Sequence, residues 1–443
     1  MGKIHIKNLG PITDASLDLS KDMCLVIGPQ ATGKSTMCKI IYFCKMIRFY
    51  FVEFLYEDTI IIETPQSELY LSFLKYIRKK YMNSFGTTKH MSRYYYVKYE
   101  YGEKTYVTIK LDEQGYAKFN FSFSIEDELK KAIMSMRKLY EDIQKDTEED
   151  AYTSINRKVQ TKREAIQHFV GDAERIFQDN EDIIYIPAGR SLLSVLSDQL
   201  DIVNTMGLDL PMRDFIERIR DTKHRFGTRL DNVVADYVKT IKGQIQNTDV
   251  ELAKQLIQKI LKAEYVNDID GEKLYIDDKH WVKLIYGSSG QQEALWIVLL
   301  LFIVILENKK SFVIVEEPEA HLYPIAQRHM MELLALTMNS SGSHLLITTH
   351  SPYIMTSSNL LLYSAKVENQ IKQAADQRII MKQYRILPDQ MSAYKFGEEY
   401  EETFYDIIDK ETGLINASEI DTISDIITEE TDKLIDMEIR YGL

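Results

Sequence analysis

The sequence predicts an α/β fold built around a parallel sheet. Short apolar runs, typical of strands that are buried on both faces, occur at residues 23–27, 312–315 and 345–348. The first run leads through a glycine-containing loop into a helical pattern that extends from about Lys34 to Leu55. Strands that alternate with helices in this way favour a parallel sheet over an antiparallel one.

The composition is that of a globular protein. Of the 443 residues, 45% are hydrophobic and 27% are charged, which excludes a disordered or fibrous chain and allows two or three domains. Cys24, Cys38 and Cys44 lack the spacing of metal ligands, so we expect buried thiols in a reducing compartment. The first ten residues contain no apolar run of a secretory signal, and we expect a cytoplasmic protein.

One apolar stretch is a candidate for membrane insertion. Residues 294–306 carry no charge, but the stretch is only 13 residues long, whereas a helix that spans a bilayer needs about 20 residues. We therefore expect a helix of the protein core, and no membrane as a partner.

The other elements are expected in a definite order. Two short strands flank the turn at Gly10 and Pro11, and residues 91–124 alternate aromatic and polar side chains like a three-stranded antiparallel unit. The pattern then predicts helices within 125–180, a strand at 183–186, mostly helices within 191–261 and short strands within 264–286.

Most of the net charge of −13 lies in the C-terminal segment. Residues 398–443 hold 15 acidic and three basic residues, and their apolar residues lie near helical spacing, so we expect one or two acidic helices. Two other stretches, 78–104 and 213–229, are basic. Basic residues among tyrosines can follow a nucleic-acid backbone, although a solvated face is the commoner explanation of such a stretch.

The first chemical motif is the loop GPQATGKST at residues 28–36, which matches G-x-x-x-x-G-K-[ST] in full. Such a loop directs backbone N–H groups at phosphates, next to a helix N-terminus that favours anions. In this pattern Lys34 reaches the β- and γ-phosphates, and the Ser35 hydroxyl can ligate Mg²⁺. We expect ATP and Mg²⁺ as cofactors. The expected binding residues of this loop are Gly28, Gln30, Thr32, Gly33, Lys34, Ser35 and Thr36.

The second motif is a pair of acids, Glu316 and Glu317, directly after the strand at 312–315. Because ligands bind at the carboxyl ends of parallel strands, Glu316 is expected to hold Mg²⁺ through water, and Glu317 is expected to polarise the attacking water. The alternative explanation is an acidic turn without a catalytic role.

Two further motifs are less specific when taken alone. The segment SSGQQE places Ser288, Ser289, Gly290 and Gln291 before the apolar helix, either as a second anion site or as a simple helix cap. His350 follows the strand at 345–348. It is either a structural histidine or, if its strand neighbours that of Glu317, a residue beside the γ-phosphate.

The order of these four motifs resembles that of ABC-type ATPase heads, which are P-loop NTPases. EEPEAHLYP and TTHSPYI, together with HIKNLGPI, LVIGPQATGKST and YIPAGRS, are similar to the OLD-type ATPases and their relatives near the SMC and RecF heads. The resemblance covers roughly residues 1–60 and 270–355. It implies an ATPase with Glu317, Lys34 and His350 as catalytic residues and with Ser35 and Glu316 at the metal. ATP would bind between two protomers, so that loop 28–36 of one faces Ser288, Ser289 and Gly290 of the other in a homodimer or a higher oligomer.

Departures from the family pattern narrow the subtype. Glu316 stands where most such heads have Asp, which implies slow turnover, and Arg190 is the candidate for a missing lid residue. The chain has no long coiled coil or Cys-x-x-Cys hook, which argues against the DNA-repair SMC-like ATPases. Residues 356–443 contain no D-x-D motif, so we expect no nuclease domain of the TOPRIM type in them.

These expectations define a domain plan and three functional hypotheses. The plan is an ABC-type core at 1–60 and 270–397, an inserted antiparallel and helical lobe at 61–269, and an acidic helical segment at 398–443. Stand-alone heads of this family often belong to anti-phage systems such as PARIS or Septu, which implies a sensor or switch that controls a separate effector, a nuclease. The second hypothesis is an ATP-dependent clamp of SMC or RecF type on double-stranded DNA. The third is the soluble motor of a membrane transporter, but the EEPEAHLYP motif is not typical of that class. The acidic segment would dock the effector, mimic nucleic acid or cap the domain.

Overall fold

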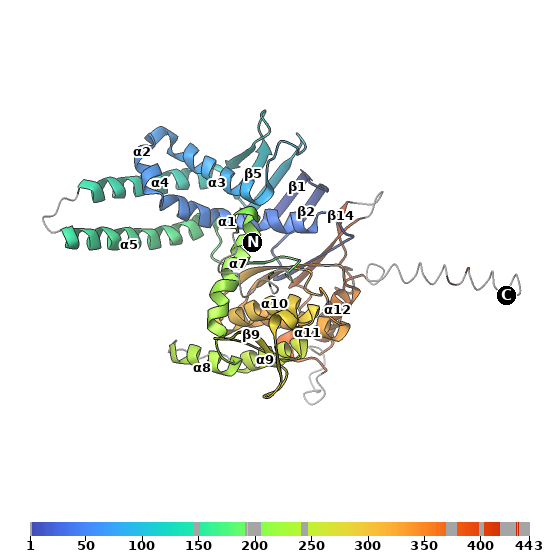
Figure 1. Ribbon diagram of the computed structural model, residues 1–443. Helices are drawn as coiled ribbons and strands as arrows, with labels where there is room; N and C mark the ends of the chain where they lie inside the picture. The colour runs from blue at the N-terminus through green and yellow to red at the C-terminus, as the bar shows by residue number, and fades with distance from the viewer. Residues whose placement is uncertain are drawn as a thin grey trace, which may run out of the picture.

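The central element of the structure is a six-stranded sheet in the order β14-β13-β3-β12-β11-β7 (Figure 1). The neighbours are parallel except for β13 and β14, as the apolar runs predict. The bounds are β3 Met23–Ile27, β7 Asp182–Ile186, β11 Ser311–Glu316, β12 His344–Thr349, β13 Met391–Phe396 and β14 Phe404–Asp406. The computed structural model describes residues 2–145, 151–190, 193, 205–240, 247–368, 379–397, 403–416, 431 and 433.

Side chains of the central sheet alternate between two hydrophobic cores. Leu25 and Ile27 belong to one core, whereas Cys24 and Val26 belong to the other. The second core contains α1, and the first contains residues of six other helices, α9 to α12 among them. This alternation is that of a sheet covered by helices on both faces. The helices are α1 Lys34–Leu55, α9 Asn247–Leu261, α10 Ser289–Glu307, α11 Pro324–Ser341 and α12 Pro352–Glu368.

The apolar helix α10 belongs to the protein core. Over the described residues it is the one helix that is long and apolar enough to cross a membrane, with a mean hydropathy of 1.8. However, 72% of that apolar window is buried inside the protein, and α10 packs against α9 and α11. The expected core helix is therefore confirmed.

A second sheet, antiparallel in the order β2-β1-β4-β5-β6, joins the N-terminal strands to the predicted three-stranded unit. Its strands are β1 Lys3–Leu9, β2 Ile12–Asp18, β4 Tyr96–Gly102, β5 Thr105–Leu111 and β6 Ala117–Phe121. The helices α4 and α5 lie side by side and extend away from this sheet (Figure 1). The helices of this part are α2 Asp58–Glu63, α3 Leu69–Phe85, α4 Phe123–Lys145 and α5 Ala151–Phe177.

The segment expected as one inserted lobe, residues 61–269, is divided in the structure. Its strand β7 pairs with β11 at the edge of the central sheet, and α9 packs against α10 and α11. Both contribute apolar residues to the cores of the central sheet, which explains why they are not part of a separate lobe. Its other elements are α7 Leu210–Lys223, α8 Leu230–Thr240, β8 Glu264–Asp268 and β9 Gly271–Tyr275, the last two of which form a third sheet with β10 Trp281–Lys283.

The described part of the acidic segment is not helical between residues 403 and 416. Phe404–Asp406 forms β14, which pairs with β13. The Phe404 ring stacks on Tyr394 at 5.3 Å and contacts Phe396 at 4.7 Å between ring centroids, so aromatic packing selects a strand here. The expected acidic helices beyond residue 416 lie almost entirely outside the described residues.

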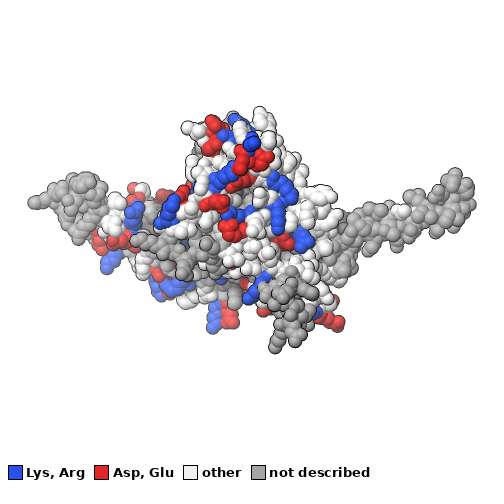
Figure 2. Space-filling model, turned by 90° about the horizontal axis from the view of Figure 1, so that it is seen from below, with Lys and Arg blue, Asp and Glu red and all other residues white. Residues whose placement is uncertain are grey.

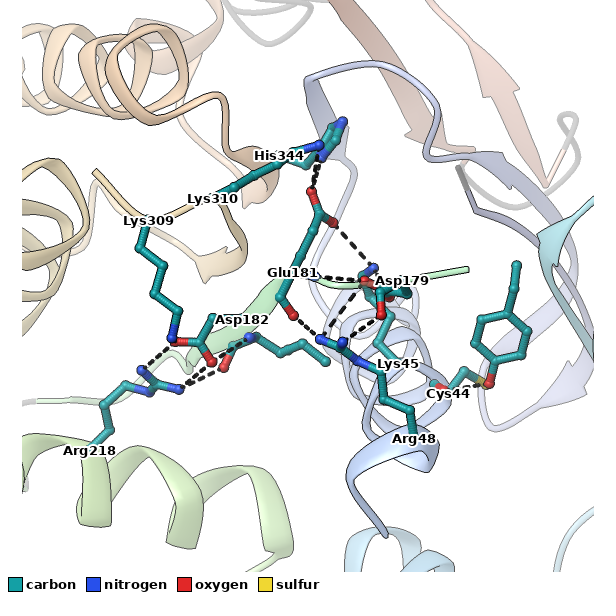
Figure 3. A network of polar contacts seen from close by, with 12 residues as sticks. Cys44, Lys45, Arg48, Asp179, Glu181, Asp182, Arg218, Lys309, Lys310 and His344 are labelled. Carbon is teal, nitrogen blue, oxygen red and sulfur yellow. Dashed lines mark hydrogen bonds and ion pairs between the residues drawn. The ribbon is translucent and has the colours of Figure 1, made fainter. Parts of the chain in front are cut away.

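Buried ion pairs connect α1 to the start of β7 (Figure 3). The ammonium of Lys45 lies 2.6 Å from the Asp179 carboxylate and 3.5 Å from that of Glu181. Arg48 donates to the backbone carbonyls of the same two acids. Because each of these side chains is less than 10% exposed, the cluster ties the helix that begins at the phosphate-loop motif to the edge strand β7.

Candidate functional site

The loop after β3 requires glycine at two positions. Gly28 and Gly33 have φ angles of +150° and +108°. A Cβ atom at Gly28 would lie 2.8 Å from Cβ of Phe396, and one at Gly33 would lie 2.5 Å from Cγ1 of Ile12. Residues that carry a side chain rarely adopt these backbone angles. The conformation of the loop between β3 and α1 therefore depends on glycine at these two positions.

Lys34 lies inside the curve of this loop. Its ammonium donates hydrogen bonds to the carbonyl oxygens of Gly28 at 2.8 Å and of Pro29 at 2.7 Å, and the side chain is 6% exposed. Burial lowers the pKa of Lys34 to about 8, against the opposing charges of Glu317 and Glu319. The group is therefore a poorly solvated cation that phosphate oxygens can stabilise.

The other expected residues of the loop surround Lys34. Thr32 Oγ1 donates to Pro29 O at 2.9 Å, which braces the turn. Gln30 is exposed, and Ser35 and Thr36 lie in the first turn of α1. The predicted arrangement of strand, loop and helix is thus present.

Strand order brings the two acids and His350 to the same edge as the loop. Thr348 of β12 is paired with Glu316 of β11 on one side and with Val26 of β3 on the other. The strand β12, which His350 directly follows, therefore lies between the strand of the acids and the strand of the loop. This adjacency is the condition on which the functional interpretation of His350 depends.

Glu316 is buried and held by two hydroxyl groups. Ser35 Oγ donates to its Oε2 at 2.8 Å, and the Tyr185 hydroxyl donates to its Oε1. Burial, followed by the charge of Glu316, raises the pKa of Tyr185 well above its ordinary value, so the phenol remains a donor. A hydroxyl and a carboxylate are ligands that suit Mg²⁺. Within the described residues no group of three or more His, Cys, Asp or Glu side chains could hold a metal, so phosphate oxygens and water would complete such a site.

Glu317 has an unusual backbone and a histidine partner. Its φ is +46°, and its N–H donates to Thr348 O at 2.9 Å. Nε2 of His350 lies 3.3 Å from its Oε1. The contact with His350 lowers the pKa of Glu317, burial opposes this shift, and the charges of Lys34 and Arg190 reinforce it. The carboxylate is therefore ionised at neutral pH and can accept a proton from water.

Glu319 is a third carboxylate of this edge, and sequence reasoning did not single it out. Its Oε1 accepts hydrogen bonds from Thr349 Oγ1 at 2.7 Å and from the His350 N–H at 2.8 Å. Its Oε2 is buried and has no hydrogen-bond partner among the described residues, and burial raises the pKa of Glu319. The side chain shapes the backbone that presents His350. The only sequence signal was its position in the motif EEPEAH.

Arg190 supports the backbone of the two acids, so the expected lid role is wrong. The side chain is fully buried and cannot cover a nucleotide. Its guanidinium donates to the carbonyl oxygens of Glu293 at 3.1 Å, Glu316 at 2.7 Å and Glu317 at 2.9 Å. Sequence alone does not distinguish a buried arginine from an exposed one in the loop after β7.

The segment at residues 288–291 begins α10 with a capping box. Ser288 Oγ accepts from the Gln291 N–H, and Gln291 Oε1 accepts from the Ser288 N–H at 2.9 Å. Ser288 and Ser289 are exposed, and a Cβ atom at Gly290 would lie 2.7 Å from His321 O. Among the described residues no hydrogen bond joins this segment to loop 28–36. One copy of the chain therefore does not unite the two expected halves of the nucleotide site.

Comparisons with known proteins give a family match and several similar solved structures. A model of the family described as AAA ATPase domain matches residues 1–355. Similar solved structures include the SMC head domain from Thermotoga maritima, with 11% identity, a TM-score of 0.34, and coverage of 80% of this chain and 90% of that chain. The SmcHead bound to the C-winged helix domain of ScpA has 13% identity, a TM-score of 0.37 and coverage of 80% and 90%. The Smc head domain with an extended coiled coil bound to the C-terminal domain of ScpA, derived from Pyrococcus furiosus, has 11% identity, a TM-score of 0.34 and coverage of 81% and 92%. No curated protein matches this chain.

Proposed function

Since the chain belongs to the family of AAA ATPase domains and is an ATP-hydrolysing enzyme with a P-loop fold, we propose that loop 28–36, Glu316, Glu317 and His350 form its active site. One observation carries the proposal: the Ser35 hydroxyl lies 2.8 Å from the Glu316 carboxylate, although the two residues are 281 positions apart in the sequence. This contact joins the phosphate loop to the end of β11. The resulting edge contains the Lys34 ammonium, two hydroxyls and the carboxyl groups of Glu316 and Glu317, where we place the triphosphate.

Each residue has a distinct part in this proposal. The loop amides and Lys34 hold the β- and γ-phosphates, and Ser35 and Glu316 would hold Mg²⁺, which offsets negative charge on the phosphates when bound. Glu317 takes a proton from water as the water oxygen bonds to the γ-phosphorus and the bond from that phosphorus to the β–γ bridging oxygen breaks. His350 holds the Glu317 carboxylate in place and contacts the departing phosphate.

The roles proposed for Glu317 and Lys34 are tested by two variants, of which one should retain ATP binding and the other should lose it. Glu317→Gln keeps the shape of the side chain but cannot take a proton, so phosphate release should fall by about 100-fold or more while ATP still binds. Lys34→Ala should weaken ATP binding itself. A Glu317→Gln variant that hydrolyses ATP at the wild-type rate would contradict the assignment of the base.

We further propose that a second copy of the chain completes the site. The N-terminus of α10 has exposed serines and an amide group at Gly290, and such a terminus attracts phosphate oxygens. Lys34→Ala and Ser289→Arg would damage opposite halves of a shared site. Mixing these two inactive variants should restore part of the ATPase activity, because a mixed dimer contains one intact site. Absence of any restoration from subunits shown to exchange would oppose the shared site.

The cellular role we propose is a switch in an anti-phage defence complex that acts on a separate nuclease. Support comes from the resemblance of EEPEAHLYP and TTHSPYI to the OLD-type ATPases and their relatives, whose stand-alone heads often belong to such systems. Cells that carry the gene with its native neighbours should reduce phage plating, and Glu317→Gln should remove this protection. If the intact locus reduces plating of no phage in a broad panel, the proposed role is wrong.

A DNA clamp is the second candidate, and one surface favours it. Strand register places Lys7, Tyr96, Lys110 and Lys118 in one row across the second sheet. Lys110 and Lys118 are exposed, and the Lys110 ammonium lies 5.3 Å from the Tyr96 ring centroid. Cationic side chains next to an aromatic ring can follow a phosphate backbone.

The other basic stretch, residues 213–229, gives less support to DNA binding. Arg218 is paired with Asp182, Arg225 with Glu307, and Arg229 with Asp278. Basic and acidic side chains are likewise interspersed on the face of the molecule in Figure 2.

Replacing basic residues of the stretch 78–104 and of the second sheet by glutamate tests the clamp. The first set is Lys79, Lys80 and Arg93, and the second set is Lys110 and Lys118. A clamp predicts ATP-dependent binding to duplex DNA that weakens steeply with salt and is lost in these variants. Unchanged DNA binding in both sets would rule out this surface.

A further inference from the structure

We propose that Tyr185 is a positioning residue for Glu316, so that its hydroxyl sets the orientation in which this carboxylate meets Mg²⁺. The inference rests on the metal role proposed for Glu316. It also accounts for the presence of Glu at a position where heads with similar motifs have Asp.

The geometry makes Tyr185 a direct neighbour of the carboxylate. Tyr185 in β7 is paired with Ile314 in β11, and Glu316 is two residues further along β11. Residues two positions apart in a strand point to the same face, so Tyr185 and Glu316 are diagonal neighbours on the face that packs against α1. The Tyr185 hydroxyl donates to Oε1, while Ser35 Oγ takes Oε2.

Two donors on two different oxygens leave the carboxylate with little rotational freedom. Both Tyr185 and Glu316 are 3% exposed, so water does not compete for the hydrogen bond between them. Partners behind a metal ligand commonly hold it in the productive orientation. Tyr185 reaches Glu316 from the edge strand β7, and Ser35 reaches it from α1.

The longer side chain of Glu316 is matched to this tyrosine. Aspartate at position 316 would carry its carboxylate one carbon–carbon bond, about 1.5 Å, closer to the backbone. A carboxylate moved by this distance no longer reaches both Ser35 and the Tyr185 hydroxyl. The phenol would then be buried without an acceptor, which is unfavourable. The effect of the Tyr185 hydroxyl should therefore depend on glutamate at position 316.

The ring of Tyr185 is held independently of its hydroxyl. It packs against Tyr42 of α1, with 5.2 Å between ring centroids, and both rings line a cleft of about 440 Å³ between α1, β7, α7 and α10. The Tyr42 hydroxyl donates to Asp214 instead of to Glu316. Tyr185→Phe removes only the donor, and Tyr42→Phe is the matched control, with the same atom removed from the neighbouring buried ring.

The test measures how much Mg²⁺ tightens ATP binding, by titration calorimetry with and without the metal. Tyr185→Phe should reduce this gain about 10-fold while ATP binding without Mg²⁺ and the unfolding temperature change little. Tyr42→Phe should leave the gain at the wild-type value. Glu316→Asp should also reduce the gain, and adding Tyr185→Phe to it should cause no further loss.

Different results separate this inference from the proposal on which it rests. If Glu316→Gln keeps the full gain from Mg²⁺, the metal role of Glu316 is wrong. If Glu316→Gln loses the gain but Tyr185→Phe keeps it, the metal role stands and the inference about Tyr185 is overturned. If Tyr185→Phe reduces the gain from Mg²⁺ equally in wild type and in Glu316→Asp, the effect is a general structural one. This result would also overturn the inference about Tyr185.

Discussion

Nε2 of His350, at the end of β12, lies 3.3 Å from Oε1 of Glu317, at the end of β11. The contact forms because β11 and β12 are adjacent parallel strands. It pairs the proposed base with a group that can hold its orientation and favour its ionised form.

Replacing His350 should change both the rate and its pH dependence. The contact with His350 lowers the pKa of Glu317, so His350→Ala should raise that pKa. The acid limb of the pH profile of kcat/KM should then shift to higher pH, and kcat should fall by about 10- to 100-fold. An unshifted acid limb in His350→Ala would show that Glu317 does not titrate in catalysis.

ATP binding should depend on the protonation of Lys34. Burial lowers the pKa of Lys34 to about 8 in the free protein, so part of the population loses this charge above pH 8. Phosphates favour the charged form, and binding in this range should therefore take up a proton. Affinity without Mg²⁺ should fall as the pH rises above 8, by up to about 10-fold per unit.

Calorimetry in buffers of different ionisation enthalpy measures this proton uptake directly. Lys34→Arg is the control, because arginine stays charged throughout this range. If the arginine variant takes up the same proton, another group is responsible.

Glu319 should act on turnover through the loop that carries His350. Its Oε1 accepts two hydrogen bonds from Thr349 and His350. Glu319→Ala removes this acceptor and should lower kcat by about 10-fold, with a small effect on KM for ATP. Glu319→Gln keeps an oxygen acceptor and should retain kcat within about threefold of wild type. Equal losses in both variants would mean that the charge matters and the acceptor does not.

The ion cluster of Figure 3 should make stability sensitive to acid. Burial of Glu181 acts to raise its pKa, but the hydrogen bond with His344 and the charge of Lys45 prevail and lower it to about 2. A group with a lowered pKa in the folded state stabilises that state above its unfolded pKa, near 4.5. This contribution is lost as the pH falls from about 4.5 to 2.

Glu181→Gln should therefore lower the free energy of unfolding by roughly 3 kcal/mol at pH 7. The difference from wild type should shrink below pH 4.5. Urea unfolding at a series of pH values measures both quantities. A constant difference from pH 7 to pH 3 would contradict the role assigned to the Glu181 charge.

Local sequence patterns predicted the helices and strands of the site better than the contacts between them. The strand at 23–27, the loop and the helix from Lys34 to Leu55 occur as predicted, because a short segment contains the whole signal. The partner of Glu316 is different. Tyr185 lies 131 residues away in the sequence, and only the pairing of β7 with β11 brings it to the carboxylate.

The division of the chain into domains was also harder to predict, because it depends on contacts between segments that are distant in the sequence. The β7 strand is five residues long and is separated from its partner β11 in the sequence by the helices α7, α8, α9 and α10 and by the third sheet. Its apolar side chains showed that it is buried but not in which sheet. Phe404 likewise belongs to the segment expected to be helical from the spacing of its apolar residues, whereas its packing against Tyr394 and Phe396 selects a strand.

The central claim is that two copies of the chain share an ATP site and that Glu317 acts in the hydrolysis of the bound ATP. The most direct test is the mass of the protein in solution, measured by light scattering. Wild type and Glu317→Gln are compared without nucleotide and with ATP and Mg²⁺. We predict that Glu317→Gln forms a lasting dimer or larger assembly with ATP, while wild type returns to its starting mass as ATP is consumed. A mass that ignores nucleotide in both proteins would contradict the shared site and would leave Ser288 and Gln291 as the cap of α10 alone.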